Sequence, residues 1–224
     1  MTVTYIHHSG FLVETRKFYY LFDYESGDLP ALNPEKPIFV LSSHSHGDHY
    51  NPAVFSKAPG ARAILSDDIA APPGIDTLLV APNREYSLGP GQKLTTFRST
   101  DLGVAFLIEE EDGRIYHAGD LNDWVWEGEP DDWNRDMTAA YRAEMALLAG
   151  KTADIAFIPA DPRLEDWFYL GVDDFMQQSD ARYIFPMHFW GDFSVCEKLK
   201  NHPCSEKYRD RIISMKEKGQ TFSL

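Results

Sequence analysis

The sequence has 224 residues, of which 43% are hydrophobic and 25% charged, and its formal net charge at pH 7 is -14. This composition is typical of globular proteins and excludes a disordered, fibrous or membrane-embedded chain. The length predicts one domain over residues 1–224. Because so acidic a chain repels phosphate backbones and anionic lipid surfaces, we expect neither a nucleic acid nor a membrane as partner.

The amino-terminal residues lack a basic region followed by a long apolar stretch, which is the pattern of a secretory signal. No window of the sequence is apolar enough to span a membrane. We therefore expect a cytoplasmic protein. Homo-oligomers are common among soluble proteins, so a homo-oligomer stays open as a further expectation.

Short β-type runs dominate the first half of the chain. They predict strands at 3–6, 11–14, 18–22, 37–41, 61–65, 93–98, 104–109 and 114–117. The run from Pro37 to Leu41 is almost wholly apolar, which indicates a buried central strand. It ends directly at Ser42-Ser43-His44, so a cluster of histidines follows the carboxyl end of a strand. Folds of the α/β class commonly place their chemistry at such a position.

The second half of the chain alternates helices with strands. The pattern predicts helices at 133–148, 172–178 and 194–200, and strands at 155–158 and 183–186. The segments 211–215 and 220–224 flank a turn-like sequence and predict a closing hairpin. A strand-rich half followed by strands with helices favours two packed sheets with helices on their outer faces over a doubly wound parallel sheet.

The run His44-Ser45-His46-Gly47-Asp48-His49 concentrates metal-binding side chains in one loop. Imidazole nitrogens and carboxylate oxygens bind divalent ions such as zinc, and a catalytic site needs several of them. In an extended loop His44 and His46 point to the same side and can bind one ion. Asp48 and His49 follow the turn at Gly47 and can bind a second. The run therefore predicts a pair of divalent metals in preference to solvated surface histidines.

This run after an apolar strand resembles the H-x-H-x-D-H motif of the metallo-β-lactamase-fold hydrolases, in particular the branch similar to ascorbate-6-phosphate lactonase. The resemblance covers nearly the whole chain. His8-Ser9-Gly10-Phe11 is similar to the opening strand of that branch, Asp23 to its first acidic position, His117-Ala118-Gly119-Asp120 to its glycine-aspartate motif, and Pro186-Met187-His188 to its last histidine motif. The resemblance implies an α/β fold that forms a four-layer αββα sandwich.

One position departs from the family pattern. The family's third motif supplies a histidine between the central run and the bridging aspartate, but the only histidine between His49 and Asp120 is His117, inside the glycine-aspartate motif. The segment Ser99-Thr100-Asp101 resembles a subgroup with an aspartate there, so we expect Asp101 to replace the histidine. A carboxylate oxygen is a harder donor than an imidazole nitrogen, so manganese or iron becomes a candidate metal in addition to zinc. It could equally leave this metal position weak or empty.

The resemblance implies a site for two divalent ions, with zinc as the first expectation. It allocates His44, His46 and Asp101 to the first ion, Asp48, His49 and His188 to the second, and Asp120 to a position between them. The implied catalytic residues are Asp48, Asp120 and His8. For His8, substrate contact and hydrogen-bonded support both stay open. Asp23 would support the metal loop. We expect a core or supporting role for His117, because its side chain points away from Asp120 along the strand.

Two ions in such a site would lower the pKa of a shared water and polarise the attacked bond. We therefore expect a hydrolase that cleaves an ester, lactone or phosphoester bond of a small metabolite through a metal-bound hydroxide. Trp124, Trp126 and Trp190 could wall a pocket or fill the core, and Arg163 could hold an anionic substrate group or form a structural ion pair. The alternatives are a metal-binding scaffold or sensor with impaired catalysis, and a phosphodiesterase acting on nucleic acid, which the acidic charge disfavours.

Overall fold

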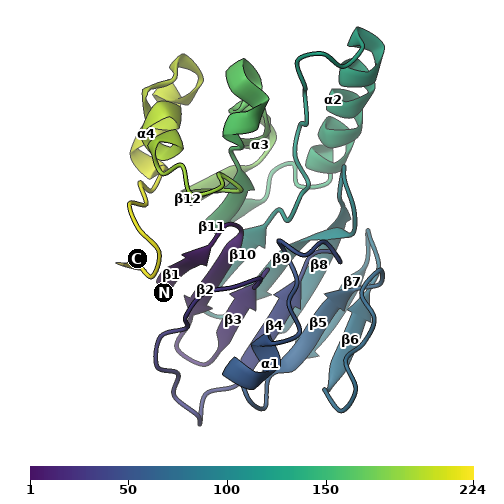
Figure 1. Ribbon diagram of the computed structural model, residues 1–224, viewed down its shortest axis with the longest axis vertical. Coiled ribbons are helices and arrows are strands. Elements are labelled where there is room, and N and C mark those ends of the chain that lie inside the picture. The colour runs from purple at the N-terminus through teal and green to yellow at the C-terminus, as the bar shows by residue number, and fades with distance from the viewer.

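Two β-sheets form the centre of the structure, a computed structural model that describes residues 1–224 (Figure 1). The first sheet has the strand order β13-β1-β2-β3-β4-β5-β6 and the second has the order β12-β11-β10-β9-β8-β7. In the first sheet the strands are β1 (Thr2–His7), β2 (Gly10–Glu14), β3 (Tyr19–Phe22), β4 (Ile38–Ser42), β5 (Arg62–Ser66), β6 (Thr77–Val80) and β13 (Thr221–Ser223). In the second they are β7 (Glu85–Gly89), β8 (Gln92–Arg98), β9 (Val104–Glu110), β10 (Gly113–His117), β11 (Thr152–Pro159) and β12 (Asp180–Met187).

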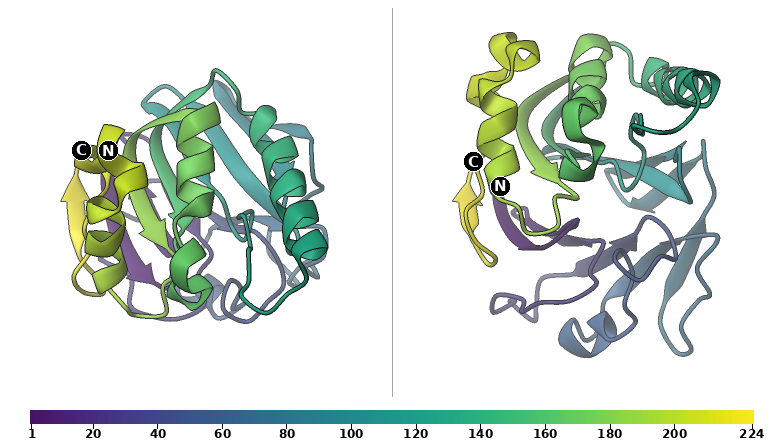
Figure 2. Two further views of the ribbon diagram at one scale, coloured as in Figure 1. Left: turned by 90° about the horizontal axis from the view of Figure 1, so that it is seen from above. Right: turned by 45° about the horizontal axis from the view of Figure 1, so that its top comes forward.

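Helices cover mainly the second sheet. The helices α2 (Asp131–Ala146), α3 (Leu170–Gln178) and α4 (Ser194–Asn201) lie side by side on one side of the molecule (Figure 2). The outer layer on the first sheet consists of the single turn α1 (Val54–Lys57) and neighbouring loops. Short 3-10 helices occur at η1 (Pro162–Trp167), η2 (Pro203–Lys207) and η3 (Arg209–Arg211). None of the helices combines the length and the apolar character that crossing a membrane requires.

Aromatic side chains from the facing sides of the two sheets form the centre of the core. Phe11 of β2 lies 4.3 Å from Phe157 of β11, and Phe22 of β3 lies 6.4 Å from Phe106 of β9, measured between ring centres. All four are fully buried or nearly so. Because a buried Phe contributes roughly 1.5–3 kcal/mol relative to an exposed one, this aromatic layer fixes how the sheets face each other.

Parallel pairing brings the chemistry-bearing loops to one edge of this sandwich. Strand β4 pairs in parallel with β3 and β5, and β11 pairs in parallel with β10 and β12. The carboxyl ends of these strands therefore meet at the same edge of their sheet. Asp23 and His44 follow β3 and β4 there, and Asp120 and His188 follow β10 and β12.

The structure confirms the mixed α/β fold with two sheets, and each strand and helix expected before residue 201 is present with small shifts of its bounds. The closing hairpin is wrong. Residues 212–215 form no strand, apart from one bridge between Ile212 and Ile184, and β13 pairs instead with β1. Phe222 of β13 packs 5.5 Å from the ring centre of Phe185, so core packing places this strand at the edge of the first sheet.

Candidate metal centre

Asp23 fixes both ends of the loop that follows β4. Its Oδ1 accepts a hydrogen bond from the Ser43 amide at 2.7 Å, and its Oδ2 accepts one from Ser43 Oγ at 2.7 Å and one from His49 Nδ1 at 2.7 Å. Burial alone would raise the pKa of Asp23, but His117 and the hydrogen bond from His49 lower it to about 2. Asp23 is therefore a buried carboxylate that holds His49 in one orientation.

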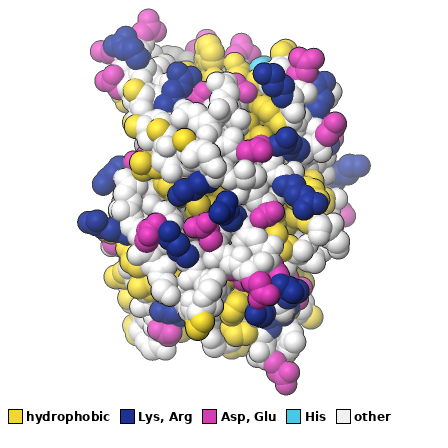
Figure 3. Space-filling view, turned by 180° about the vertical axis from the view of Figure 1, so that it is seen from behind, with side chains coloured by type: hydrophobic (Ala, Val, Ile, Leu, Met, Phe, Trp, Pro, Cys, Tyr) yellow, Lys and Arg dark blue, Asp and Glu magenta, His cyan; other side chains and the backbone are white.

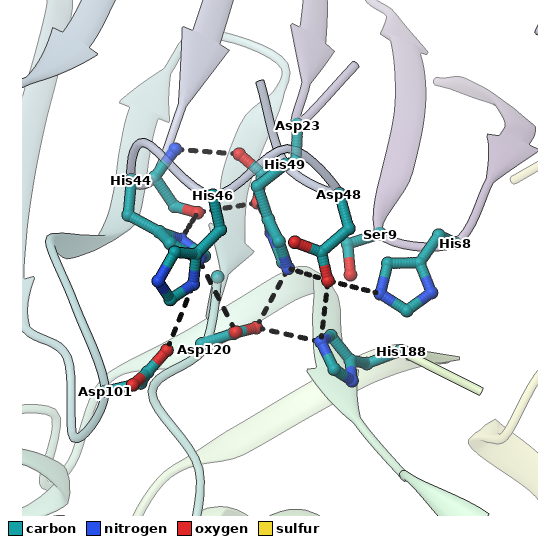
Figure 4. Close-up of polar contacts among 12 residues, drawn as sticks. His8, Ser9, Asp23, His44, His46, Asp48, His49, Asp101, Asp120 and His188 are labelled. Atoms are coloured by element: carbon teal, nitrogen blue, oxygen red, sulfur yellow. Dashed lines mark hydrogen bonds and ion pairs between the residues drawn. The ribbon is translucent and has the colours of Figure 1, made fainter. Parts of the chain in front are cut away.

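The first of two clusters of side chains that could hold a metal ion consists of His44, His46, Asp101 and Asp120. Nε2 of His44 lies 3.0 Å from Nδ1 of His46. Asp101 Oδ2 lies 3.4 Å from Nδ1 of His46, and Asp120 Oδ2 lies 3.6 Å from Nε2 of His44 (Figure 4). The side chains of His46 and Asp101 are about half exposed, so this cluster opens to solvent.

A second cluster consists of His8, Asp48, His49 and His188 and lies deeper. Asp120 faces it with its other oxygen, because Oδ1 lies 3.2 Å from His49 Nε2 and 3.4 Å from His188 Nε2. Asp48 Oδ2 lies 3.9 Å and 4.0 Å from the same two nitrogens. Figure 4 shows Asp120 between the two groups of side chains.

The unpaired atoms at the centre of the second cluster fit a bound cation. His49 Nε2, His188 Nε2 and Asp120 Oδ1 are buried and have no hydrogen-bond partner. Buried polar atoms are nearly always paired, so three orphans that face one point indicate a missing ligand. Donors that share an ion at about 2.1 Å lie roughly 3–4 Å apart, which matches the spacing observed here. Nitrogen and carboxylate donors of this kind suit zinc, manganese or iron.

Hydrogen bonds on the far side of each ring aim the histidines at the clusters. The Nδ1 atoms of His44, His49 and His188 bond to Ser43 Oγ, Asp23 and Asp161 respectively. Because Nδ1 is occupied, each ring directs its Nε2 toward the centre, where the Nε2 atoms of His49 and His188 have no partner and that of His44 contacts His46 Nδ1. Such outer partners set the tautomer and the orientation of metal-binding histidines.

Asp161 is a residue of the site that sequence reasoning missed. It is fully buried after β11, and its Oδ2 accepts a hydrogen bond from His188 Nδ1 at 2.9 Å. Burial would raise its pKa, but the hydrogen bonds from His188 and Arg163 lower it to about 2. One signal was available, since Asp161 follows the carboxyl end of a strand as Asp120 does. Arg163, weighed as a substrate contact or an ion pair, forms the ion pair with Asp161.

His117 lies behind the metal-binding side chains and not among them. Its Nε2 donates to the Ser9 carbonyl at 2.9 Å and its Nδ1 accepts from the Gly119 amide at 3.1 Å. The ring is fully buried and stacks on Phe22 with 4.8 Å between ring centres. Burial lowers the pKa of His117. The structure thus places it in the supporting position expected from the strand pattern.

His8 belongs to the second cluster in space. It is 2% exposed, its Nε2 lies 3.6 Å from Asp48 Oδ2, and neither ring nitrogen has a hydrogen-bond partner. Its ring centre lies 4.2 Å from that of His188. His8 is not among the residues that line the adjacent cavity. This location favours a role beside Asp48 over direct contact with a substrate.

Two glycines permit the close approach of the loops that carry Asp101 and Asp120. A Cβ on Gly103 would lie 2.0 Å from the Ser43 carbonyl oxygen, and one on Gly119 would lie 2.5 Å from Cβ of Ser43. Both glycines also have positive φ, at 71° and 53°. Only glycine fits at these two positions, since any side chain would push the loops away from the histidine run.

Comparisons with known proteins agree with the presence of a metal centre. The family described as "Beta-lactamase superfamily domain" matches residues 2–127. The UPF0173 metal-dependent hydrolase of Desulforamulus reducens is 31% identical over 214 residues, which cover 84% of each chain. The UPF0173 metal-dependent hydrolase YtkL of Bacillus subtilis is 27% identical over 225 residues, which cover 88% of this chain and 89% of that protein.

Solved structures show the same fold. Igni18, a metallo hydrolase from Ignicoccus hospitalis, superposes over 100% of this chain and 98% of its own, with a TM-score of 0.65 and 16% identity. A metal-dependent hydrolase structure from Parabacteroides distasonis covers 92% of this chain and 88% of its own, with a TM-score of 0.61 and 16% identity. At this identity the likeness extends to the fold alone.

Proposed function

The chain belongs to the beta-lactamase superfamily and, within it, to the UPF0173 metal-dependent hydrolases, and from this premise we propose that it uses two divalent ions to hydrolyse a small metabolite. The bond would be an ester, a lactone or a phosphoester. His44, His46 and Asp101 would hold the first ion, Asp48, His49 and His188 the second, and Asp120 would bridge them. Zinc is the first candidate, with manganese or iron as alternatives because of Asp101.

The position of Asp120 carries the proposal. Its Oδ2 lies 3.6 Å from His44 Nε2 and its Oδ1 lies 3.2 Å from His49 Nε2, so one carboxylate faces both clusters. A carboxylate that faces two separate groups of donors supports a pair of ions more than it supports one. When bound, two divalent ions acidify a water molecule and polarise the oxygen of the bond under attack.

Side chains at the cavity floor have defined tasks in this proposal. Asp48 is partly exposed and lines the cavity, and the ring of His8, whose Nε2 lies 3.6 Å from Asp48 Oδ2, holds the pKa of Asp48 well below its ordinary value. It is therefore an ionised carboxylate at neutral pH, able to accept a hydrogen bond from a water at its Oδ2. Asp120, which lines the same cavity, would help to orient this water, and buried His8 holds Asp48 in place.

The alternative functions fit the observations less well. A metal-binding scaffold or sensor would follow if the altered third motif left the first ion unsupported, but Asp101 Oδ2 lies 3.4 Å from His46 Nδ1, within reach of a shared ion. A nuclease would need a basic surface. On the face shown in Figure 3, Lys and Arg side chains are interspersed with Asp and Glu. The net charge of -14 also disfavours a nucleic acid as substrate.

An activity screen with matched variants tests the proposal. Protein reconstituted with zinc, manganese or iron would be assayed against lactones, carboxylic esters, phosphomonoesters and phosphodiesters. We expect turnover in at least one class, loss of that turnover in His46→Ala, and retention in the control His202→Gln, which alters a histidine outside both clusters. Turnover retained in His46→Ala would refute the site, and no turnover with both ions bound would favour the sensor.

A further inference from the structure

A cavity of about 420 Å³ opens onto the metal-binding side chains. Its floor includes residues of both clusters, and its opposite wall contains Trp124, Trp126, Trp133 and Trp190. These are four of the five tryptophans in the chain. They come from the loop before α2, from the first turn of α2 and from the loop after β12. The fold thus gathers distant aromatic residues over one site, which random placement of five tryptophans does not explain.

The four indoles do not all have the same role. Trp124 is 6% exposed and donates its Nε1 hydrogen to the Asp120 carbonyl at 2.9 Å, so it supports the bridging loop. Trp133 and Trp190 are 39% and 52% exposed. Large aromatic side chains stabilise a protein mainly by being buried, so these two gain little from their position in the protein alone.

Trp190 is also held in an unfavourable backbone conformation. Its φ is 53°, in the left-handed region that bulky residues rarely adopt. The indole contacts the ring of His8, with 4.3 Å between ring centres, and its Nε1 donates to Asp161 Oδ2 at 3.4 Å, yet about half of the residue stays exposed above these contacts. Strain of this kind concentrates at ligand-binding and catalytic positions, where the surrounding structure maintains it.

Arg163 is the only Lys or Arg that lines this cavity. Its guanidinium carbon lies 4.8 Å from the ring centre of Trp190 and 5.6 Å from that of Trp126. Its side-chain hydrogen bonds to Asp161 use Nε and Nη2, which leaves Nη1 for a ligand. The ion pair and the two indoles hold this cation rigidly, so little conformational entropy is lost when an anion binds.

We propose that Trp126, Trp133, Arg163 and Trp190, the aromatic subsite, bind a flat aromatic ring that carries a carboxylate. The ring lies against the exposed indoles, because aromatic pairs gain more than their buried area alone. The carboxylate lies at Arg163 Nη1. This inference rests on the proposed hydrolase function and narrows its substrates to anionic aryl compounds whose scissile bond lies over the two clusters.

Binding without turnover tests the subsite. Isothermal titration of the metal-loaded protein would compare benzoate, cyclohexanecarboxylate and benzyl alcohol, which separate the flat ring from the charge. We expect benzoate to bind roughly tenfold tighter than either of the others. Equal affinity for benzoate and cyclohexanecarboxylate would overturn the role of the ring, and equal affinity for benzoate and benzyl alcohol would overturn the role of the charge.

Variants locate the bound carboxylate. Arg163→Met is expected to weaken benzoate roughly tenfold and to leave benzyl alcohol unchanged, while the metal content of the variant shows that the clusters persist. In Trp190→Gly the new glycine adopts this φ freely, and the variant is expected to weaken the binding of benzoate more than that of cyclohexanecarboxylate. Trp167→Ala alters the one tryptophan that does not line the cavity and should change nothing.

The possible results have separate meanings. Benzoate affinity retained in Arg163→Met would mean that the metals bind the carboxylate, and this would overturn the proposal. Because no bond is cleaved in these titrations, a subsite that binds benzoate in a protein without hydrolase activity would contradict the proposed function alone. Active protein that shows no preference for benzoate would contradict the subsite alone.

Discussion

Oδ2 of Asp161 accepts a hydrogen bond from Nδ1 of His188 at 2.9 Å, and both side chains are buried. This bond leaves Nε2 of His188 bare and directed at Asp120, 3.4 Å from its Oδ1. A residue outside both clusters thereby sets the orientation of one candidate metal ligand.

Asp161→Asn should therefore lower the affinity for the second ion without unfolding the protein. An amide at this position still accepts one hydrogen bond but loses the negative charge that makes His188 a stronger ligand. Loss of such outer partners lowers metal affinity about 10- to 100-fold. Competition with a chelator measures the affinity, and circular dichroism checks the fold. Wild-type metal affinity in a folded variant would show that Asp161 is only a partner of Arg163.

Asp101→Ala should remove the first ion selectively. Asp101 Oδ2 lies 3.4 Å from His46 Nδ1 and both side chains are about half exposed, whereas His49 and His188 are buried. The first ion thus has the more exposed donors and exchanges faster. Elemental analysis after dialysis should give about two ions per wild-type chain and about one per variant chain. Asp101→His, which restores a nitrogen donor, should shift the preference from manganese toward zinc. Two ions in Asp101→Ala would remove Asp101 from the ligand set.

Metal uptake should release protons. Burial would lower the pKa of His49, but Asp120 and Asp23 raise it to about 9 in the metal-free protein. The ring is then protonated at pH 7, and a ligand must first lose that proton. Apparent metal affinity should therefore rise with pH up to about 9 and level off above it. Titration calorimetry in buffers of different ionisation enthalpy counts the protons. An affinity independent of pH between 7 and 9 would mean that His49 binds no metal.

His8→Ala separates support of the second cluster from contact with a substrate. His8 is 2% exposed and lies 3.6 Å from Asp48. Its loss should let the Asp48 side chain move and lower the affinity for the second ion. Because the cavity is lined by other residues, the variant should lose kcat at limiting metal, regain it when metal is saturating, and show little change in KM. A raised KM with metal affinity unchanged would instead assign His8 to the substrate.

Local sequence patterns indicated the centre of the site because its key residues are consecutive. His44 to His49 lie in one run, and Asp120 and His188 each end a recognisable strand. Asp161 also follows the end of a strand, but no local pattern links it to His188, which follows another strand, and the parallel pairing of β11 and β12 brings the two together.

Three strands, β6, β7 and β13, were not predicted correctly from the sequence, and each failure has a physical reason. Strands β6 and β7 are short and only partly buried: β6 has a brief apolar run of three residues, and β7 is mostly polar. The turn-like sequence before β13 predicts a hairpin with residues 211–215. The actual partner of β13, strand β1, lies at the other end of the chain, and Thr2 pairs with Ser223. Pairing over such a separation depends on the packing of the whole sandwich, which periodicity does not encode.

The central claim is that one carboxylate bridges two ions, and a metal count on Asp120→Ala beside the wild-type protein tests it most directly. Asp120 faces both clusters, with Oδ2 at 3.6 Å from His44 Nε2 and Oδ1 at 3.2 Å from His49 Nε2. Each protein would be reconstituted with zinc, dialysed and analysed by mass spectrometry of the elements. The account predicts two ions per wild-type chain and weakened retention of both in the variant. One ion or none in the reconstituted wild-type protein, or two tightly held ions in Asp120→Ala, would contradict it.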